Sequence, residues 1–196
     1  MYRITLVALL FFPAFSNAEA LTATQSWHDQ RAVTADFSFS TLLEITEYDL
    51  WSVRAIRVFN RRSGVLLQEI QVVDASAASQ NPNEMVSIID ANFDGHPDFF
   101  VPFSDGGGGP NYMDNYYLFN SAAGVFEIDA ELSTLSEIFF NPNGKISFSY
   151  RSGCCADHGG TYRFFGGKLK LVADWDISLI NGDWIETKTR RMKNGK

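Results

Sequence analysis

The stretch DANFDGHPDFFVPFSDGGGGPNYMDNYYLFN, from Asp90 to Asn120, decides the fold. It contains two short segments rich in aromatic residues, DFFVPF at 98–103 and NYYLFN at 115–120. An acidic loop precedes the first segment, and a run of four glycines separates the two. Short apolar segments bounded by Gly, Asn and Pro are typical of β-strands. The stretch therefore predicts two strands with a loop before each of them.

Most of the remaining chain repeats this pattern of short strand-like segments between turn residues. The 17 Phe, 7 Tyr and 4 Trp agree with it, because antiparallel sheets favour aromatic side chains. Only DAELSTLSEIFF, at 129–140, could form a short helix. We expect an all-β fold of about 8–10 short strands, arranged as a single antiparallel sandwich, an open barrel or a propeller-like meander.

The first residues have the features of a secretory signal peptide. Arg3 precedes the apolar run ITLVALLFFPAF, and small residues follow at the end of the segment. That order predicts a signal peptide over 1–18, with cleavage after Ala18 or Ala20. The apolar run is shorter than the ~20 residues that a transmembrane helix needs. We therefore expect an exported protein whose single all-β domain covers 19–196.

The charge balance limits the class of partner. The chain has 16 basic and 23 acidic residues and a formal net charge of -7, and loss of Arg3 makes it one unit more negative. This balance argues against nucleic acid or an anionic membrane surface as the partner. It favours a basic partner, calcium or simple solubility.

The two cysteines, Cys154 and Cys155, are adjacent. A vicinal disulfide, a partly reduced pair and an intermolecular bridge are all compatible with the sequence. Neighbouring cysteines close no long loop, so they contribute little stability by chain crosslinking. Their spacing also lacks the two intervening residues of a thioredoxin-like motif.

The acidic loop DANFDGHPD has the oxygen-ligand spacing of a calcium site. Candidate ligands occupy positions one, three, five, seven and nine: Asp90, Asn92, Asp94, the carbonyl of His96, and Asp98. Gly95 permits the sharp turn, but Val101 stands where an EF-hand has its bidentate Glu. The flanking strands favour an FG-GAP-like strand-loop-strand site with a structural calcium ion. The alternative is a metal-free turn rich in Asp and Asn.

The glycine loop SDGGGGPNYM could be a flexible hairpin tip, or it could present Asn111, Tyr112 and Met113 to a partner. Tyrosine offers a large rigid surface with one polar group, as interface hot spots do. The loop lacks the Lys and the Ser or Thr of a phosphate-binding P-loop. We expect a protruding recognition loop centred on Tyr112.

A second candidate loop, SGCCADHGGTY, contains Ser152, Gly153, His158 and Tyr162. His158 follows Asp157, which raises the question of catalysis. The histidines are His28, His96 and His158, and no nucleophile elbow, zinc-ligand spacing or triad motif surrounds any of them. We therefore expect a binding protein rather than an enzyme.

NFDGHPDFFV, GGGGPNYMDNYYLFN, GVFEID and GTYRFFGGKLKLV together resemble a known family, over roughly 85–173. The family comprises periplasmic immunity proteins of bacteria that kill rivals with a type IV secretion system, and its members are similar to periplasmic lysozyme inhibitors. The resemblance implies a periplasmic location and a lysozyme-like peptidoglycan hydrolase as the partner. It also implies that a Tyr-bearing loop plugs the hydrolase cleft, and Tyr112, beside Asn111, is the matching position. The segment from Ser152 to Tyr162 is longer than the Ser-Gly loop of lysozyme inhibitors.

Two other classes of function remain open. The first is a secreted carbohydrate-binding or adhesion module with a structural calcium site, in which exposed aromatic residues contact a glycan. The second is a hydrolase of unknown type, because catalytic groups need not be close in sequence. Binding to isolated peptidoglycan favours the first, and a tight complex with a hydrolase favours the inhibitor.

Overall fold

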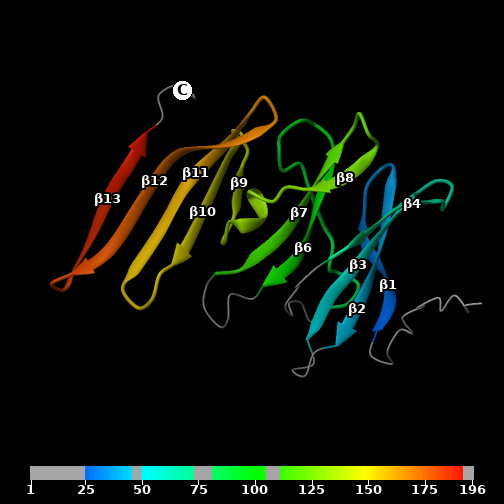
Figure 1. Ribbon diagram of the computed structural model, residues 1–196, viewed down its shortest axis with the longest axis horizontal. Helices are drawn as coiled ribbons and strands as arrows, with labels where there is room; N and C mark the ends of the chain where they lie inside the picture. Colours follow the sequence, from blue (N-terminus) through cyan, green and yellow to red (C-terminus); the bar gives the residue numbers. More distant parts are fainter. Residues whose placement is uncertain (1–24, 46–49, 73–80, 105–110, 192–196) are drawn as a thin grey trace, which may run out of the picture.

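A computed structural model describes residues 25–45, 50–72, 81–104 and 111–191, with side chains up to residue 188. Within these ranges the chain forms thirteen strands in three antiparallel sheets. The sheets follow one another along the long axis in chain order, from blue to red (Figure 1). The prediction of an all-β antiparallel fold is confirmed. Each sheet is a meander of consecutive strands, and none of the three closes into a barrel.

The N-terminal sheet has four strands in sequential order. They are β1 (Gln25–Val33), β2 (Phe37–Ile45), β3 (Trp51–Asn60) and β4 (Leu66–Gln71). A short turn around Gly64 joins β3 to β4, and the φ of +69° at this residue is one that glycine adopts without strain. The segment NRRSG, at 60–64, thus forms the turn of the β3–β4 hairpin.

The central sheet contains the two aromatic segments DFFVPF and NYYLFN. Its strands are β5 (Ser87–Ile89), β6 (Asp98–Ser104), β7 (Met113–Asn120) and β8 (Val125–Ile128). β6 pairs with β7, which places Phe99 opposite Tyr117 and Phe100 opposite Tyr116. The prediction of two strands on either side of the glycine run is confirmed.

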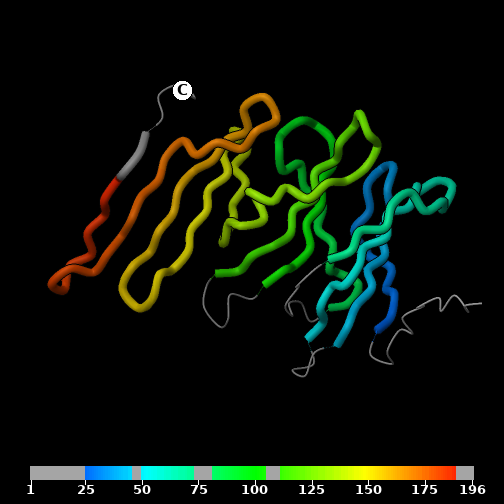
Figure 2. Tube along the Cα trace, in the orientation of Figure 1, coloured from blue at the N-terminus to red at the C-terminus, as the bar shows by residue number. Residues whose placement is uncertain are grey.

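The C-terminal sheet is the largest, with five strands in the order β13-β12-β11-β10-β9. Its members are β9 (Phe139–Asn141), β10 (Lys145–Arg151), β11 (Ala156–Phe165), β12 (Lys168–Ile180) and β13 (Asp183–Arg191). The tube in Figure 2 shows β12 and β13 as the outermost strands at the end of the molecule opposite to β1. The thirteen described strands exceed the expected 8–10, and β9 lies in the segment for which a helix was considered.

Two hydrophobic clusters lie on opposite faces of the central sheet. Phe99, Val101 and Tyr117 point into the first cluster with side chains of the N-terminal sheet. Phe100 and Tyr116, which alternate with them, point into the second cluster with side chains of the C-terminal sheet. A strand that is buried on both faces needs a nearly continuous apolar run, and DFFVPF and NYYLFN supply it.

Two local expectations need correction. The possible helix at 129–140 is a single 3₁₀ turn, Leu132–Thr134, and the chain reaches β9 through a bend at Glu137. The second candidate loop is also much shorter than its Gly content suggests. Only 152–155 form the turn, while Asp157 to Tyr162 lie in β11. Gly159 and Gly160 are buried strand residues, because large neighbouring side chains occupy the space above them.

Candidate functional site

Asn111 connects the two candidate loops of the sequence. Residues 105–110, which include the glycine run, lie outside the described residues, and Asn111 is the first described residue after them. Its Nδ2 donates to the carbonyl of Arg151 at 3.1 Å, and the Arg151 amide donates to its Oδ1 at 2.7 Å. The amide side chain thus pairs with the backbone at the end of β10 and fixes the start of β7 beside it.

Tyr112 has an anchored backbone and a free ring. Its carbonyl accepts the Glu137 amide at 3.0 Å, and its own amide donates to Glu137 Oε1 at 3.1 Å. Glu137 adopts a φ of +49°, a left-handed conformation that non-glycine residues rarely take. The Tyr112 side chain is 60% exposed. Met113, which is half-buried, bridges to Ser136 and continues into β7.

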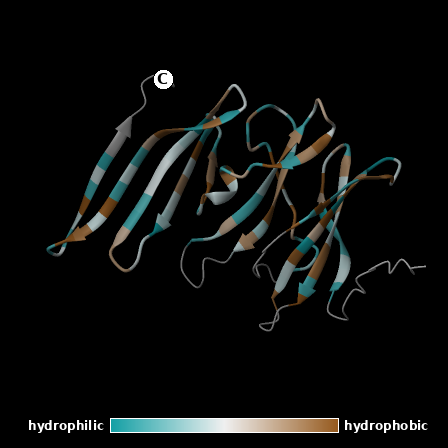
Figure 3. Cartoon of the chain, viewed as in Figure 1, coloured by the Kyte–Doolittle hydropathy of each residue, from teal (hydrophilic) through white to brown (hydrophobic). Residues whose placement is uncertain are grey.

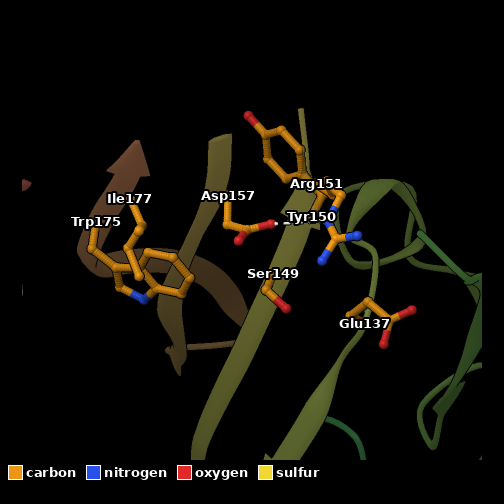
Figure 4. A pocket seen from close by; sticks show the side chains of 7 residues that line it. All are labelled: Glu137, Ser149, Tyr150, Arg151, Asp157, Trp175 and Ile177. Atoms are coloured by element: carbon orange, nitrogen blue, oxygen red, sulfur yellow. Dashed lines mark hydrogen bonds and ion pairs between the residues drawn. The ribbon is translucent and has the colours of Figure 1, made fainter. Parts of the chain in front are cut away.

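A pocket of about 280 Å³ lies next to this anchor. Its lining consists of Glu137, Ser149, Tyr150, Arg151, Asp157, Trp175 and Ile177. In Figure 4, Trp175 and Ile177 enter from one side, Glu137 stands on the other, and Ser149 and Asp157 lie between them. The pocket therefore combines an indole, an aliphatic side chain, two carboxylates, a guanidinium and a hydroxyl.

Gly159 shapes one wall of this pocket. It pairs with Trp175 across β11 and β12, and a Cβ at this position would lie 2.4 Å from Cζ2 of the indole. The same Cβ would lie 2.7 Å from the Phe148 carbonyl oxygen. Only glycine lets the Trp175 ring lie against the backbone of β11. The indole consequently extends across the sheet toward Ser149.

The charged groups of the site form a small exposed network. Arg151 Nε contacts Asp157 Oδ1 at 3.4 Å, and the two side chains are 56% and 36% exposed, so this pair adds little stability. Asp114, in β7 two residues after Tyr112, is partly buried. The pKa of Asp114 is raised to about 6, mainly because the carboxylate is buried. A hydrogen bond from Tyr116 lowers this pKa, and the negative charge of Glu137 raises it.

The second candidate loop divides into three environments. Ser152 and Gly153 are exposed in the turn that also carries the disulfide between Cys154 and Cys155. His158 lies within β11, where its Nδ1 contacts the Asp176 carboxylate and its ring lies 4.9 Å from that of Tyr150. Tyr162 lies further along β11 and packs against the second hydrophobic cluster, and burial raises its pKa. These residues do not converge on one site.

The acidic loop forms a network of side-chain to backbone hydrogen bonds. Asp90 Oδ1 and Oδ2 accept the amides of Asp94 and Gly95 at 3.1 and 3.0 Å. Asp94 Oδ1 accepts the His96 amide at 2.8 Å, and Asn92 donates to Asp94 Oδ2 at 2.9 Å. Gly95 has a φ of +87°, as the predicted sharp turn requires.

Asp98, the ninth residue of the loop, differs from the others because it is only 1% exposed. Its Oδ2 accepts the Ala91 amide at 2.9 Å, and its Oδ1 accepts the Phe119 amide at 2.8 Å. Burial raises the pKa of Asp98 to about 6, although these amide hydrogen bonds oppose the change. Asp98 therefore ties the acidic loop to β7.

The remaining groups of the loop match calcium in donor type. Each bonded carboxylate oxygen keeps a second lone pair for a cation, and the Asn92 oxygen and the His96 carbonyl are further hard donors. The described residues contain no group of three His, Cys, Asp or Glu side chains placed to hold a metal ion. A calcium loop differs from such a group, because it also uses amide and backbone carbonyl oxygens.

Six residues that line this pocket were not singled out by the sequence: Glu137, Ser149, Tyr150, Arg151, Trp175 and Ile177. They come from the bend before β9 and from strands β10 and β12, which the strand register brings together across β11. Glu137 lies in the segment predicted as a helix, and Trp175 reads as one of several strand aromatics. The glycine pair at 159–160 is the one local signal, because adjacent glycines within a strand indicate close approach by a neighbouring group.

Comparison with known proteins supports the fold. No protein-family model and no curated protein sequence matches this chain. A solved structure, described as a Xanthomonas type IV secretion system related protein, is similar in fold with a TM-score of 0.57. The match covers 87% of this chain and 97% of that one, at 14% sequence identity. Among the described residues, no helix is long and apolar enough to span a membrane.

Proposed function

We propose that this protein is a periplasmic immunity protein that inhibits a lysozyme-like peptidoglycan hydrolase, with Tyr112 as the residue that enters the hydrolase cleft. The observation that carries this proposal is the contrast at Tyr112 between a fixed backbone and an exposed ring. Hot-spot residues are commonly rigid aromatic side chains that need little ordering on binding. The protein acts by binding and is not an enzyme.

Three further features support the proposal. The chain resembles the immunity-protein family in sequence motifs, and a protein of similar fold is described as related to a type IV secretion system. The net charge of -7 would steer the protein toward a basic partner. Glu137 and Asp157 place negative charge near Tyr112, where a basic rim around a hydrolase cleft would meet it.

The first prediction concerns Tyr112→Ala. We expect an affinity for the cognate hydrolase about thirtyfold lower, because truncation of a central interface Tyr commonly costs about 2 kcal/mol. The free energy of unfolding should change by less than about 0.5 kcal/mol, since the ring is exposed. The measurement is inhibition of peptidoglycan lysis by lysozyme-like effectors, together with thermal unfolding of each variant.

Tyr112→Phe separates the ring from the hydroxyl and should show intermediate inhibition if the hydroxyl bonds a catalytic carboxyl. Ile128→Ala is a matched control, because Ile128 is similarly exposed but lies on β8. Full inhibition by Tyr112→Ala would refute the role of this residue. Failure of the wild-type protein to inhibit any such hydrolase would refute the function itself.

We also propose that the acidic loop binds a structural calcium ion through Asp90, Asn92, Asp94 and the His96 carbonyl, with Asp98 supporting the loop. The second prediction follows from ligand linkage, because an ion that binds only the folded state stabilises it. Excess calcium should raise the melting temperature of the wild type and should raise that of Asp94→Ala much less.

The comparison is made between calcium and chelator for each variant, because Asp94→Ala also removes the hydrogen bonds that Asp94 makes to His96 and Asn92. Magnesium at the same concentration is the ionic control, since it requires a more rigid octahedral site. Equal melting temperatures of the wild type in calcium and in chelator would exclude a structural calcium ion.

A further inference from the structure

We propose that the outer face of the C-terminal sheet, centred on Trp175, binds an N-acetylhexosamine polysaccharide chain. The outer face is defined here by Ser149, Arg151, Asp157, Trp175 and Ile177. It is the face opposite to Ile146 and Phe148, which pack into the second hydrophobic cluster. This binding is separate from the proposed inhibition, because it requires no hydrolase.

The indole of Trp175 provides a flat binding platform. It lies against Gly159, which holds the ring across the sheet and leaves a wall of the pocket open to a ligand. Pyranose rings carry axial C–H groups on one face, and these groups pack well on a flat aromatic ring. An indole buries a large area in such a contact. The position of Gly159 indicates that the platform is preformed, which lowers the entropic cost of binding.

Polar groups beside the platform match the hydroxyls of a sugar. Asp157 and Glu137 accept hydrogen bonds, Arg151 donates them, and Ser149 does both. Arg151 and Asp157 already contact each other at 3.4 Å, so neighbouring donor and acceptor groups face the same space. Each sugar hydroxyl can both donate and accept a hydrogen bond, so a pair of adjacent hydroxyls binds well where a donor lies beside an acceptor. Ile177 gives an apolar contact for the methyl of an N-acetyl group.

The apolar strip continues beyond the pocket, which favours a chain over a single sugar. Leu179 is 40% exposed, and Trp184, its partner across the β12–β13 hairpin, is 57% exposed. Figure 3 shows hydrophobic colour at this end of the two strands. Residues 175, 177 and 179 share one face of β12, because side chains alternate along a strand. Successive sugars could therefore contact Trp175 and then Trp184.

The outer face of the N-terminal sheet provides an internal contrast. Trp27 also lies on a sheet face, but the Arg57 guanidinium covers its ring at 3.8 Å. Arg57 is itself held by Glu69, with Nε to Oε2 at 2.8 Å. The Arg57 side chain thus covers the face of the Trp27 ring that a ligand would need. The ring of Trp175 instead lines an open pocket.

The charge of the site selects against other polymers. Two carboxylates and one guanidinium line the pocket, and the chain carries a net charge of -7. Nucleic acid and strongly anionic polysaccharides would be repelled. An uncharged chain of N-acetylhexosamines is compatible with this field and uses both the polar and the apolar walls.

The test uses the full-length exported protein without any hydrolase. Tryptophan fluorescence is followed during titration with a β-1,4-linked N-acetylglucosamine hexamer, and co-sedimentation is measured with chitin, an insoluble uncharged polymer of the same sugar. We expect both probes to bind the wild type, Trp175→Ala to weaken binding at least tenfold, and Asp157→Asn to weaken it less. Trp27→Ala is the matched control and should bind like the wild type.

A β-1,4-linked glucose hexamer tests the role of the N-acetyl group and should bind more weakly than the N-acetylated hexamer. Absence of binding of the wild type to both N-acetylated probes would overturn the proposal, as would unchanged binding by both Trp175→Ala and Asp157→Asn. Equal loss in Trp27→Ala would also overturn it, because it would place binding elsewhere. None of these three outcomes would affect the inhibition proposed for Tyr112, which is measured with a hydrolase.

Discussion

Asp98→Ala is expected to lower the free energy of unfolding by about 3 kcal/mol. The Asp98 carboxylate accepts the amides of Ala91 and Phe119, which belong to the acidic loop and to β7. Truncation leaves both donors without this acceptor in a region where Asp98 itself is 1% exposed. An unsatisfied buried donor costs about 1–3 kcal/mol.

Asp98→Asn is the sharper comparison, because it keeps the size of the side chain. Its single amide oxygen can accept one of the two N–H groups, while its NH₂ group would face the other. We expect the free energy of unfolding of Asp98→Asn to lie between that of the wild type and that of Asp98→Ala. The measurement is chemical denaturation in the presence of a calcium chelator. A stability of Asp98→Ala equal to that of the wild type would show that the two amides find other acceptors.

Asp114→Asn is expected to have the opposite effect and to raise the free energy of unfolding at pH 7 by about 2–3 kcal/mol. Asp114 resembles Asp98 in having a pKa raised to about 6, mainly by burial. Its hydrogen bond is much weaker, because Tyr116 donates to it at 3.4 Å. A neutral amide of the same shape therefore avoids the cost of a buried charge and retains an acceptor for Tyr116.

The pH dependence tests this cause directly. The pKa of Asp114 is about 6 in the folded protein and about 4 in the unfolded chain, so the folded state binds more protons between these values. The contribution of Asp114 therefore makes the wild type less stable as pH rises from 4 to 6, and it is constant above pH 7. Asp114→Asn should lack this decrease, so the two proteins should differ little at pH 4 and most at pH 7. A difference that does not change with pH would contradict the assignment.

The two carboxylates show how little a raised pKa says by itself about the role of a side chain. Asp98 connects two segments through backbone hydrogen bonds, so its removal breaks contacts that nothing replaces. Asp114 lies beside Glu137, whose charge raises its pKa further, so its ionised form is disfavoured. Because Glu137 also anchors Tyr112, ionisation at Asp114 is coupled electrostatically to the proposed inhibitory surface.

The sequence by itself determined the fold class, the two central strands and the turn at Gly95. Alternation of apolar and polar residues, aromatic content and the placement of glycines are local properties, and they are sufficient to predict strands and turns. The sequence also identified Tyr112 as a candidate for exposure, because the preceding Gly and Pro residues make burial in its own core difficult. The structure agrees, since the ring is 60% exposed.

Only the tertiary structure decided which residues share a surface. The contacts of Asn111 with Arg151, of Tyr112 with Glu137 and of Gly159 with Trp175 depend on how strands from different sheets and hairpins align. The sequence assigned Gly159 and Gly160 to a loop, because the residue type alone does not distinguish a glycine in a turn from a strand glycine that packs beneath a large side chain. Pairing of β11 with β12 places Trp175 over Gly159, and two hydrogen bonds hold Glu137 beside Tyr112.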